Sequence, residues 1–247
     1  MNYKLTLQYD GTDFHGWQMQ SGERTVQGEL TRVAALLERG EVVVHGAGRT
    51  DAGVHAEGQV ASVRLNREIE PERLRAALNG NLARDVRVME ACVVADDFHA
   101  RYSARGKTYV YRIFNAPVMS PLLNRYALHE ARRLDTELMR RAARLFPGEH
   151  DWTAFSSAQS EARTRVRTVT ELEVTEHVDG RGRLIEIKAS ADGFLRYMVR
   201  SIVGTLLAAG RGEADEETIR RAINTGDRSL AGATAPPHGL TLLKVHY

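Results

Sequence analysis

A glycine-rich segment carries the two side chains whose types and spacing best suit chemistry. It reads Gly-Ala-Gly-Arg-Thr-Asp-Ala-Gly-Val-His-Ala from Gly46 to Ala56, and it follows an apolar run from Val42 to Val44 that is typical of a strand. Glycines in such a segment allow a tight turn or the close approach of another group. Arg49 and Asp51 lie two residues apart within it. A short carboxylate on a tight loop beside a guanidinium is a candidate nucleophile or base.

Two other interpretations of this segment compete. Gly46 and Gly48 could open a dinucleotide-binding fingerprint, but the sixth position is Asp51 rather than glycine, and strand-like alternation follows instead of a helix. The segment therefore fails the structural context that this fingerprint needs. The remaining alternative is a turn with a surface ion pair, an arrangement that contributes little to stability. Residue types alone leave that alternative open.

A second candidate is Arg200, in a helix predicted from Phe194 to Ala209. The apolar residues of this stretch form a broad stripe at helical spacing, which predicts packing on the core. They are Phe194, Leu195, Met198, Val199, Ile202, Val203, Leu206 and Leu207. Arg196, Arg200 and Gly204 fall together on the opposite side. From residue types alone, that side is most simply a solvated face with two arginines.

A predicted strand from Lys107 to Phe114 supplies further candidates. Tyr109, Tyr111 and Ile113 share one face of this strand, because side chains alternate along a strand with a period of two. Core packing is the simplest interpretation of both tyrosines, and it is the one adopted for Tyr111. Near the C-terminus, Leu240 reads as an ordinary residue of a closing strand.

The elements that must position these residues indicate an α+β fold. Helices and strands alternate in two similar halves, without the strict strand–helix order of a doubly wound sheet, so two sheets joined edge to edge are expected. The halves are residues 1–115, with the glycine-rich segment, and 116–247, with Arg200 and the closing strand. The predicted strands cover 3–9, 59–65, 86–94, 107–114, 165–174, 184–189 and 241–247, and helices begin near 25, 71, 135, 194 and 215.

Composition and charge exclude several classes of protein. The 247 residues carry a formal net charge of only +2, which neither requires nor excludes nucleic acid as a partner. Cys92 is the single cysteine, so an intrachain disulfide and a cysteine-based zinc site are both excluded. The chain begins directly on a strand pattern and has no apolar run of membrane-spanning length, which predicts a cytoplasmic protein without a signal peptide.

Arginines gather in several short clusters. Arg163, Arg165 and Arg167 alternate and are expected to project from one face of a strand, while the pairs 132–133 and 140–141 add further positive charge. Solvated surface and RNA contact are both open interpretations of these clusters.

The string from Gly46 to Ala56 resembles the catalytic loop of the tRNA pseudouridine synthase A family. The run from Gly193 to Gly204 is similar to the family motif that contains the partner arginine, although Tyr197 stands where the family usually has histidine. A second departure is Ala233, where the family often has proline. Matching stretches extend from the first strand to the last: Leu7-Gln8-Tyr9-Asp10-Gly11, His15-Gly16-Trp17-Gln18, Thr25-Val26-Gln27-Gly28, Phe98-His99-Ala100-Arg101 and Arg228-Ser229-Leu230-Ala231-Gly232.

This resemblance implies a role for each candidate residue. Asp51 would be the catalytic nucleophile and Arg200 its partner. Tyr109 would stack on the target base, and Leu240 would form another wall of the uracil pocket. Arg49 would contact the backbone of the flipped-out nucleotide. Whether Asp51 attacks the ribose or acts on the base stays open.

The resemblance also implies a fold, a substrate and an assembly. The fold would be a central antiparallel sheet with a cleft between two similar halves. The enzyme would isomerise uridine to pseudouridine at positions 38, 39 and 40 of the tRNA anticodon stem-loop, by base flipping, as a homodimer with no cofactor or metal. The alternative is a non-catalytic tRNA-binding module or RNA chaperone on the same fold. A binder needs no nucleophile, so the combination of Asp51, Tyr109 and Arg200 disfavours it.

Overall fold

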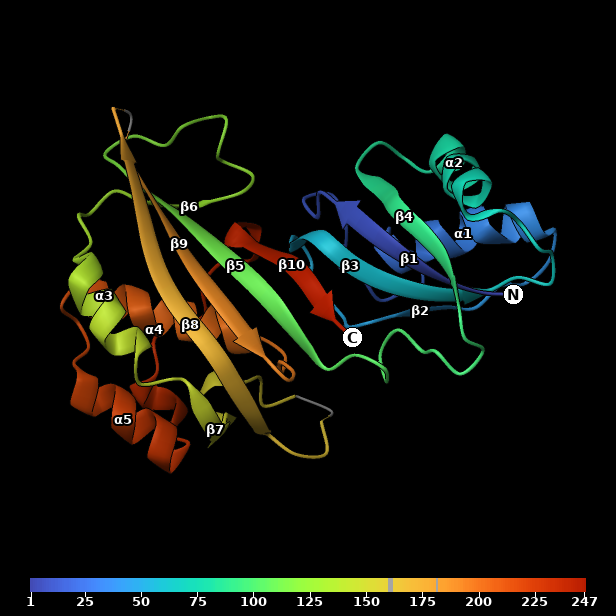
Figure 1. The fold of residues 1–247 in the computed structure, drawn as a ribbon. Coiled ribbons are helices and arrows are strands. Elements are labelled where there is room, and N and C mark those ends of the chain that lie inside the picture. The colour runs from blue at the N-terminus through green and yellow to red at the C-terminus, as the bar shows by residue number, and fades with distance from the viewer. Residues whose placement is uncertain (160–161, 181) are drawn as a thin grey trace. The chain divides into compact units, whose positions relative to one another are not determined.

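The computed structural model describes residues 1–159, 162–180 and 182–247, and its chain divides into two compact units (Figure 1). Unit 1 comprises Met1–Arg105 and Thr241–Tyr247, and unit 2 comprises Gly106–Leu240. These packing boundaries differ from the predicted halves 1–115 and 116–247, and the division into those halves stays a prediction about domain organisation. Residues 106–115 form the first strand of unit 2, and the last seven residues complete the sheet of unit 1.

The sheet of unit 1 is largely antiparallel. Its order is β4-β1-β3, and both β2 and β10 pair with the far side of β3. The pairing of β10 with β3 is parallel. Apolar alternation predicts β1 correctly, because Tyr3, Leu5 and Leu7 are fully buried. The strands are β1 (Asn2–Tyr9), β2 (Val44–Gly46), β3 (His55–Arg64), β4 (Val86–Val94) and β10 (Leu240–His246).

Two helices lie side by side on this sheet, α1 (Val26–Glu38) and α2 (Pro71–Asn81) (Figure 1). Thr25 caps α1 as predicted, since its hydroxyl accepts a hydrogen bond from the Gly28 N–H at 3.2 Å. The start of α2 is fixed by Pro71 in its first turn and by the Glu70 carboxylate, which accepts from two backbone N–H groups. Each helix buries its apolar stripe in the unit's core.

The strands of unit 2 follow the order β5-β9-β8-β7, with β6 parallel to β5. The other pairings within it are antiparallel. The predicted strand over 107–114 is confirmed, and its Tyr111 and Ile113 are fully buried. The strands are β5 (Gly106–Asn115), β6 (Leu128–Glu130), β7 (Gly148–Asp151), β8 (Val166–Asp179) and β9 (Gly182–Ala191).

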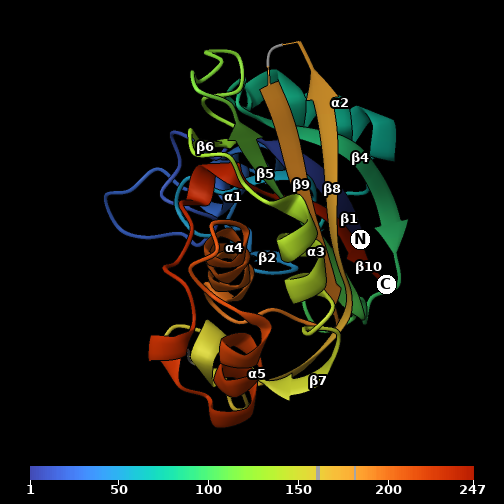
Figure 2. The same ribbon diagram turned by 90° about the vertical axis from the view of Figure 1, so that its left-hand side faces the viewer.

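The helices of unit 2 lie on one side of β8 and β9 (Figure 2). They are α3 (Thr136–Ala143), α4 (Met198–Gly210) and α5 (Glu216–Thr225). Asp135 and Asp215 accept backbone N–H groups at the starts of α3 and α5, in agreement with the predicted helix starts. Short 3-10 turns complete the unit at η1 (Thr153–Phe155), η2 (Arg228–Leu230) and η3 (Pro237–Gly239).

Three sequence predictions in unit 2 are wrong. The helix predicted from Phe194 begins only at Met198, because Tyr197 has a left-handed backbone with φ of 66°. Arg196 therefore precedes the helix, and Gly204 is buried rather than on a solvated face. Strand β8 begins at Val166, so Arg163 and Arg165 do not lie on its face.

Gly204 packs so closely that alanine is expected to destabilise the protein. A Cβ at Gly204 would lie 1.6 Å from the Ala233 carbonyl oxygen, so the segment after η2 would have to move. We expect Gly204→Ala to lower the free energy of unfolding by about 2 kcal/mol or more, measured by urea denaturation. The control is Gly80→Ala in α2, where an added Cβ meets nothing within 4 Å. That variant should be neutral or slightly stabilised, and equal effects of the two substitutions would contradict the packing argument.

The α+β fold class is confirmed. Both units combine helices with largely antiparallel strands, in contrast to a doubly wound parallel sheet. Across the described residues, no helix is long and apolar enough to cross a membrane.

Candidate active site

The glycine-rich segment connects two strands of unit 1, as the sequence predicts. It begins where β2 ends, at Gly46, and joins β3 at His55. We call residues 46–56 the catalytic loop, after the family motif that they resemble, while their role in catalysis stays a prediction. Asp51 is half-buried near its middle, Arg49 is exposed, and Gly53 takes a positive φ of 77°. The Asp51 carbonyl accepts a hydrogen bond from the Val54 N–H at 3.1 Å, which closes a turn just after the carboxylate.

The segment from residue 10 to 18, which we call the brace, packs directly against the catalytic loop. The backbone N–H of Trp17 donates to the Thr50 carbonyl at 3.0 Å. The Trp17 ring is fully enclosed, and a Cβ at Gly46 would lie 2.4 Å from it. A Cβ at Gly11 would lie 2.0 Å from the Val54 carbonyl oxygen. These glycines are therefore required because the brace and the loop approach each other with no space for a side chain.

Buried polar side chains hold the catalytic loop in place. The Tyr9 hydroxyl lies 2.8 Å from the Thr50 hydroxyl, and the Gln59 amide donates to the Gly48 carbonyl at 3.0 Å. Burial raises the pKa of Tyr9 to about 12, although its hydrogen bonds with Thr50 and Gln59 act in the opposite direction. The hydroxyl therefore stays protonated near neutral pH. These contacts fix the backbone on either side of Arg49 before any substrate arrives.

Arg49 has a partner that the sequence analysis did not identify. Its Nε donates to the Gln18 side-chain oxygen at 3.1 Å. Gln18 ends the His15-Gly16-Trp17-Gln18 stretch, and its neighbour Trp17 holds the loop. The sequence does contain a signal for Gln18, because that stretch is part of the family resemblance. The function of the stretch as a brace, however, depends on contacts between residues more than 30 positions apart in the chain, such as Trp17 and Thr50.

A charged pair ties the brace to the rest of unit 1. Both terminal nitrogens of Arg24 donate to the Asp85 carboxylate, at 2.7 and 2.8 Å, and the guanidinium lies 4.0 Å from the centroid of the Phe14 ring. The Asp85 carbonyl also accepts from the Asp10 N–H at 2.9 Å. The hydrogen bonds from Arg24 hold the pKa of Asp85 below its ordinary value of 3.8, against the cost of desolvation.

Asp85→Asn is expected to remove a pH-dependent part of the stability. A carboxylate with a lowered pKa in the folded state stabilises the protein above pH 3.8 and loses that effect as the pH falls through the folded pKa. The pair is partly solvated, so we expect a loss of about 1 kcal/mol at pH 7. In urea titrations at pH 7, 4 and 3, the variant and the wild type should converge toward acid. Asp97→Asn, at an exposed aspartate, is the control, and a difference that persists unchanged at pH 3 would contradict the assignment.

In unit 2, Arg200 lies in the first turn of α4 and is fixed by the segment after η2. Its Nε donates to the Ala235 carbonyl at 2.7 Å, and the Ala235 N–H donates to the Arg200 carbonyl at 3.0 Å. The Arg200 guanidinium carbon lies 4.9 Å from the centroid of the Tyr197 ring. Tyr197, at the position where the family usually has histidine, therefore supports the arginine by a cation–π contact.

Residues 235–240 of unit 2 link the strand that carries Tyr109 with Leu240. Tyr109 is 7% exposed and meets Phe194 edge to face, with centroids 5.1 Å apart. Two residues further along β5, the Tyr111 hydroxyl donates to the Pro236 carbonyl at 2.9 Å. Leu240, 6% exposed, directly follows η3. Residues 235–240 thus connect Arg200, the strand of Tyr109, and Leu240.

The five predicted site residues fall into two groups. Arg49 and Asp51 share the braced loop of unit 1, while Tyr109, Arg200 and Leu240 are gathered in unit 2. Each group is built as an ordered local structure. The pairing of Asp51 with Arg200, residues of different units, stays a prediction, as do the catalytic and binding roles of all five residues.

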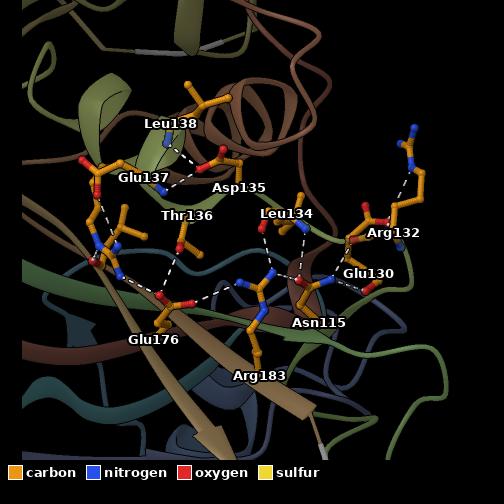
Figure 3. A network of polar contacts seen from close by, with 12 residues as sticks. Asn115, Glu130, Arg132, Leu134, Asp135, Thr136, Glu137, Leu138, Glu176 and Arg183 are labelled. Atoms are coloured by element: carbon orange, nitrogen blue, oxygen red, sulfur yellow. Dashed lines mark hydrogen bonds and ion pairs between the residues drawn. The ribbon is translucent and has the colours of Figure 1, made fainter.

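A separate polar cluster in unit 2 contains none of these residues (Figure 3). Arg183 donates to the Leu134 carbonyl and to Glu176, and the Asn115 amide donates to the Glu130 carbonyl at 2.7 Å. It adjoins a cavity of about 510 Å³ at the start of α3. Its charged groups are engaged with one another and with backbone carbonyls, so its role is to connect α3 with β5, β8 and β9.

The structure is thus an α+β protein in which residues 10–18 brace a glycine-rich loop that carries Asp51. A sequence profile for tRNA pseudouridine synthase matches residues 6–103 and 142–247. The tRNA pseudouridine synthase A 2 of Clostridium perfringens is 43% identical over 100% of this chain and 99% of its own length. The tRNA pseudouridine synthase A of Acetivibrio thermocellus shows the same identity and coverage. The chain belongs to the tRNA pseudouridine synthase family, a family of isomerases.

These matches confirm the family resemblance and the enzyme class that the sequence predicts. Among solved structures, the archaeal box H/ACA sRNP Nop10-Cbf5 complex aligns with 93% of this chain and 59% of that chain, at 12% identity and a TM-score of 0.39.

Proposed function

We propose that this chain converts uridine to pseudouridine in the anticodon stem-loop of tRNA, at positions 38, 39 and 40, with Asp51 as the nucleophile. One observation carries the proposal. In a member of this family, a carboxylate lies half-buried on a glycine-rich loop that Trp17, Gln59 and Tyr9 hold in place. Such a loop presents the carboxylate in a fixed geometry, which nucleophilic catalysis requires.

The reaction needs only a bond exchange within one nucleotide. The bond between ribose C1′ and uracil N1 breaks, the uracil turns, and a bond forms between C1′ and C5. The proton of C5 leaves to water, and N1 gains a proton, so atoms and electrons balance without an oxidant or a second substrate. Asp51 either adds to C1′ or acts on the base during the exchange.

The other site residues would hold the nucleotide during this exchange. The target uridine would be flipped out of the stack, because its C1′ and C5 are inaccessible within a helix. Tyr109 would stack on the uracil and Leu240 would close the pocket, so that the freed base turns without escaping. Arg49, held by Gln18, would contact a phosphate of the flipped nucleotide.

We also propose that the enzyme is a homodimer in the cytoplasm, with one tRNA lying across both subunits. The family resemblance supports this, since the chain matches its relatives along its full length. Light scattering should give a mass of twice 27.5 kDa for the purified chain, and a monomer at working concentrations would contradict the assembly.

Release of tritium from tRNA labelled at uracil C5 tests the reaction. The wild type should release tritium from an unmodified transcript, and replacing the uridines at positions 38 to 40 with cytidine should abolish the release. A binding module or chaperone on this fold would bind the transcript and release none. Release that persists after the replacement would keep the chemistry and overturn the choice of site.

A further inference from the structure

Three aromatic rings form a continuous stack on the surface of unit 1. The Tyr102 ring lies on His99 with centroids 4.4 Å apart, and His99 lies on His45 with centroids 4.6 Å apart; both pairs are tilted by 36°. We call these residues the Tyr102 stack. Tyr102 is 79% exposed, so the outer ring of the stack presents its surface to solvent.

The turn that carries Tyr102 is rigidly built. The His99 Nδ1 accepts from the N–H groups of Arg101 and Tyr102, at 3.1 and 3.4 Å. The His99 N–H donates to the Ser103 hydroxyl at 3.1 Å, and the Ser103 N–H donates back to the His99 carbonyl at 2.9 Å. The exposed ring is therefore positioned in advance, which reduces the entropy lost when a ligand binds.

The middle ring of the stack, His99, is neutral near pH 7. Burial lowers the pKa of His99, and the charges of His45 and Arg101 act in the same direction. A neutral imidazole supports the tyrosine as a flat surface. Positive charge lies over the tyrosine ring, because the Arg101 guanidinium carbon is 5.9 Å from the centroid of the Tyr102 ring, and Arg101 itself is exposed.

The Tyr102 stack adjoins the catalytic loop. His45 is the residue before Gly46, where the loop begins, and its partner across the strands is Ser62. The Ser62 hydroxyl accepts from the Ala100 N–H at 3.1 Å, which fixes the Tyr102 turn against the same strand pair. Asp51 is six residues beyond His45, so their Cα atoms are at most about 20 Å apart.

We infer that the Tyr102 stack is a binding platform for an unpaired base of the RNA substrate, distinct from the target uridine, and that Arg101 contacts a neighbouring phosphate. This inference rests on the proposed function, which brings an RNA strand to Asp51. A flat ring next to an exposed cation suits a base and its phosphate. Stacking accepts any base, so the platform holds the strand in register and does not read its sequence.

Removal of the exposed ring tests this platform. We expect Tyr102→Ala to weaken binding of a fluorescent uridine hexanucleotide about tenfold, and to raise KM for the tRNA transcript without changing kcat. Tyr102→Phe and Tyr102→Trp should restore both values, because they keep the stacking surface.

Arg101→Ala should reduce the slope of log affinity against log salt by about one, whereas the Tyr102 variants should leave the slope unchanged. Tyr126→Ala, which removes a partly exposed ring in unit 2, is the control.

The outcomes separate this inference from the proposed function. Hexanucleotide binding does not depend on turnover, and a wild type without tritium release would overturn the proposed function. If the wild type is active but Tyr102→Ala leaves KM and hexanucleotide affinity unchanged, the platform is overturned and the exposed ring is left to a protein partner. If Tyr102→Phe and Tyr102→Trp bind the hexanucleotide as weakly as Tyr102→Ala does, stacking is also overturned, because both of these variants keep an aromatic ring. Should the alanine variant unfold, Tyr102→Leu takes its place, because leucine keeps an apolar side chain but has no ring on which a base could stack. Unchanged hexanucleotide affinity in that variant would overturn the platform.

Discussion

Asp51→Ala is expected to reduce tritium release from C5-labelled tRNA by at least about 1,000-fold, while the affinity for tRNA stays close to that of the wild type. If Asp51 forms the covalent bond or acts directly on the nucleotide, no other group of the braced loop can take its place. Binding should survive, because phosphate contacts supply most of the affinity for RNA and alanine removes none of them. Single-turnover release and filter binding at one salt concentration measure the two quantities.

The loop backbone makes this variant a clean test. Asp51 supports the loop through its carbonyl, which accepts the Val54 N–H, and alanine keeps that bond. Asp13→Ala provides a matched control, since it removes an exposed carboxylate from the brace. The control should retain near wild-type release. Substantial turnover by Asp51→Ala would show that the nucleophile lies elsewhere.

The local parts of the fold could be predicted from sequence because their signals are local. Thr25 precedes an apolar helical stripe and caps α1, and the alternation from Tyr3 to Tyr9 defines β1. The start of α4 could not be predicted in this way. Apolar spacing continues back to Phe194, but Tyr197 takes a left-handed backbone that only the surrounding packing can impose on a residue other than glycine.

The candidate site was predictable in its residues but not in its supports. The resemblance names Asp51 and Arg49, yet nothing in the sequence shows that Gly46 is small because Trp17 occupies the space of a side chain. Nor does it pair Arg49 with Gln18. These contacts join segments about 30 residues apart, and sequence periodicity contains no information about such pairings.

Arg200 is the second residue whose loss should have a large effect. We expect Arg200→Ala to lower kcat/KM by about 100-fold, as happens when one member of a catalytic charge pair is truncated. Arg200→Lys should recover only part of the activity, because lysine keeps the charge but lacks the planar fork and the Nε–H donated to Ala235. Arg196→Ala is the matched control. Its guanidinium carbon also lies 4.9 Å from the Tyr197 ring centroid, but it precedes α4.

Loss of activity alone would not show that Arg200 pairs with Asp51, since Arg200 also anchors Ala235. A double-mutant cycle on the free energy of unfolding isolates the pairing. The local cost of losing the Ala235 contact is the same with or without Asp51 and cancels in the cycle. We therefore expect Asp51→Ala and Arg200→Ala to show a coupling of about 1 kcal/mol or more, while Asp51→Ala and Arg196→Ala should be additive within about 0.5 kcal/mol. Additivity in the first cycle would leave Arg200 as a structural anchor of residues 235–240 and remove it from the charge pair.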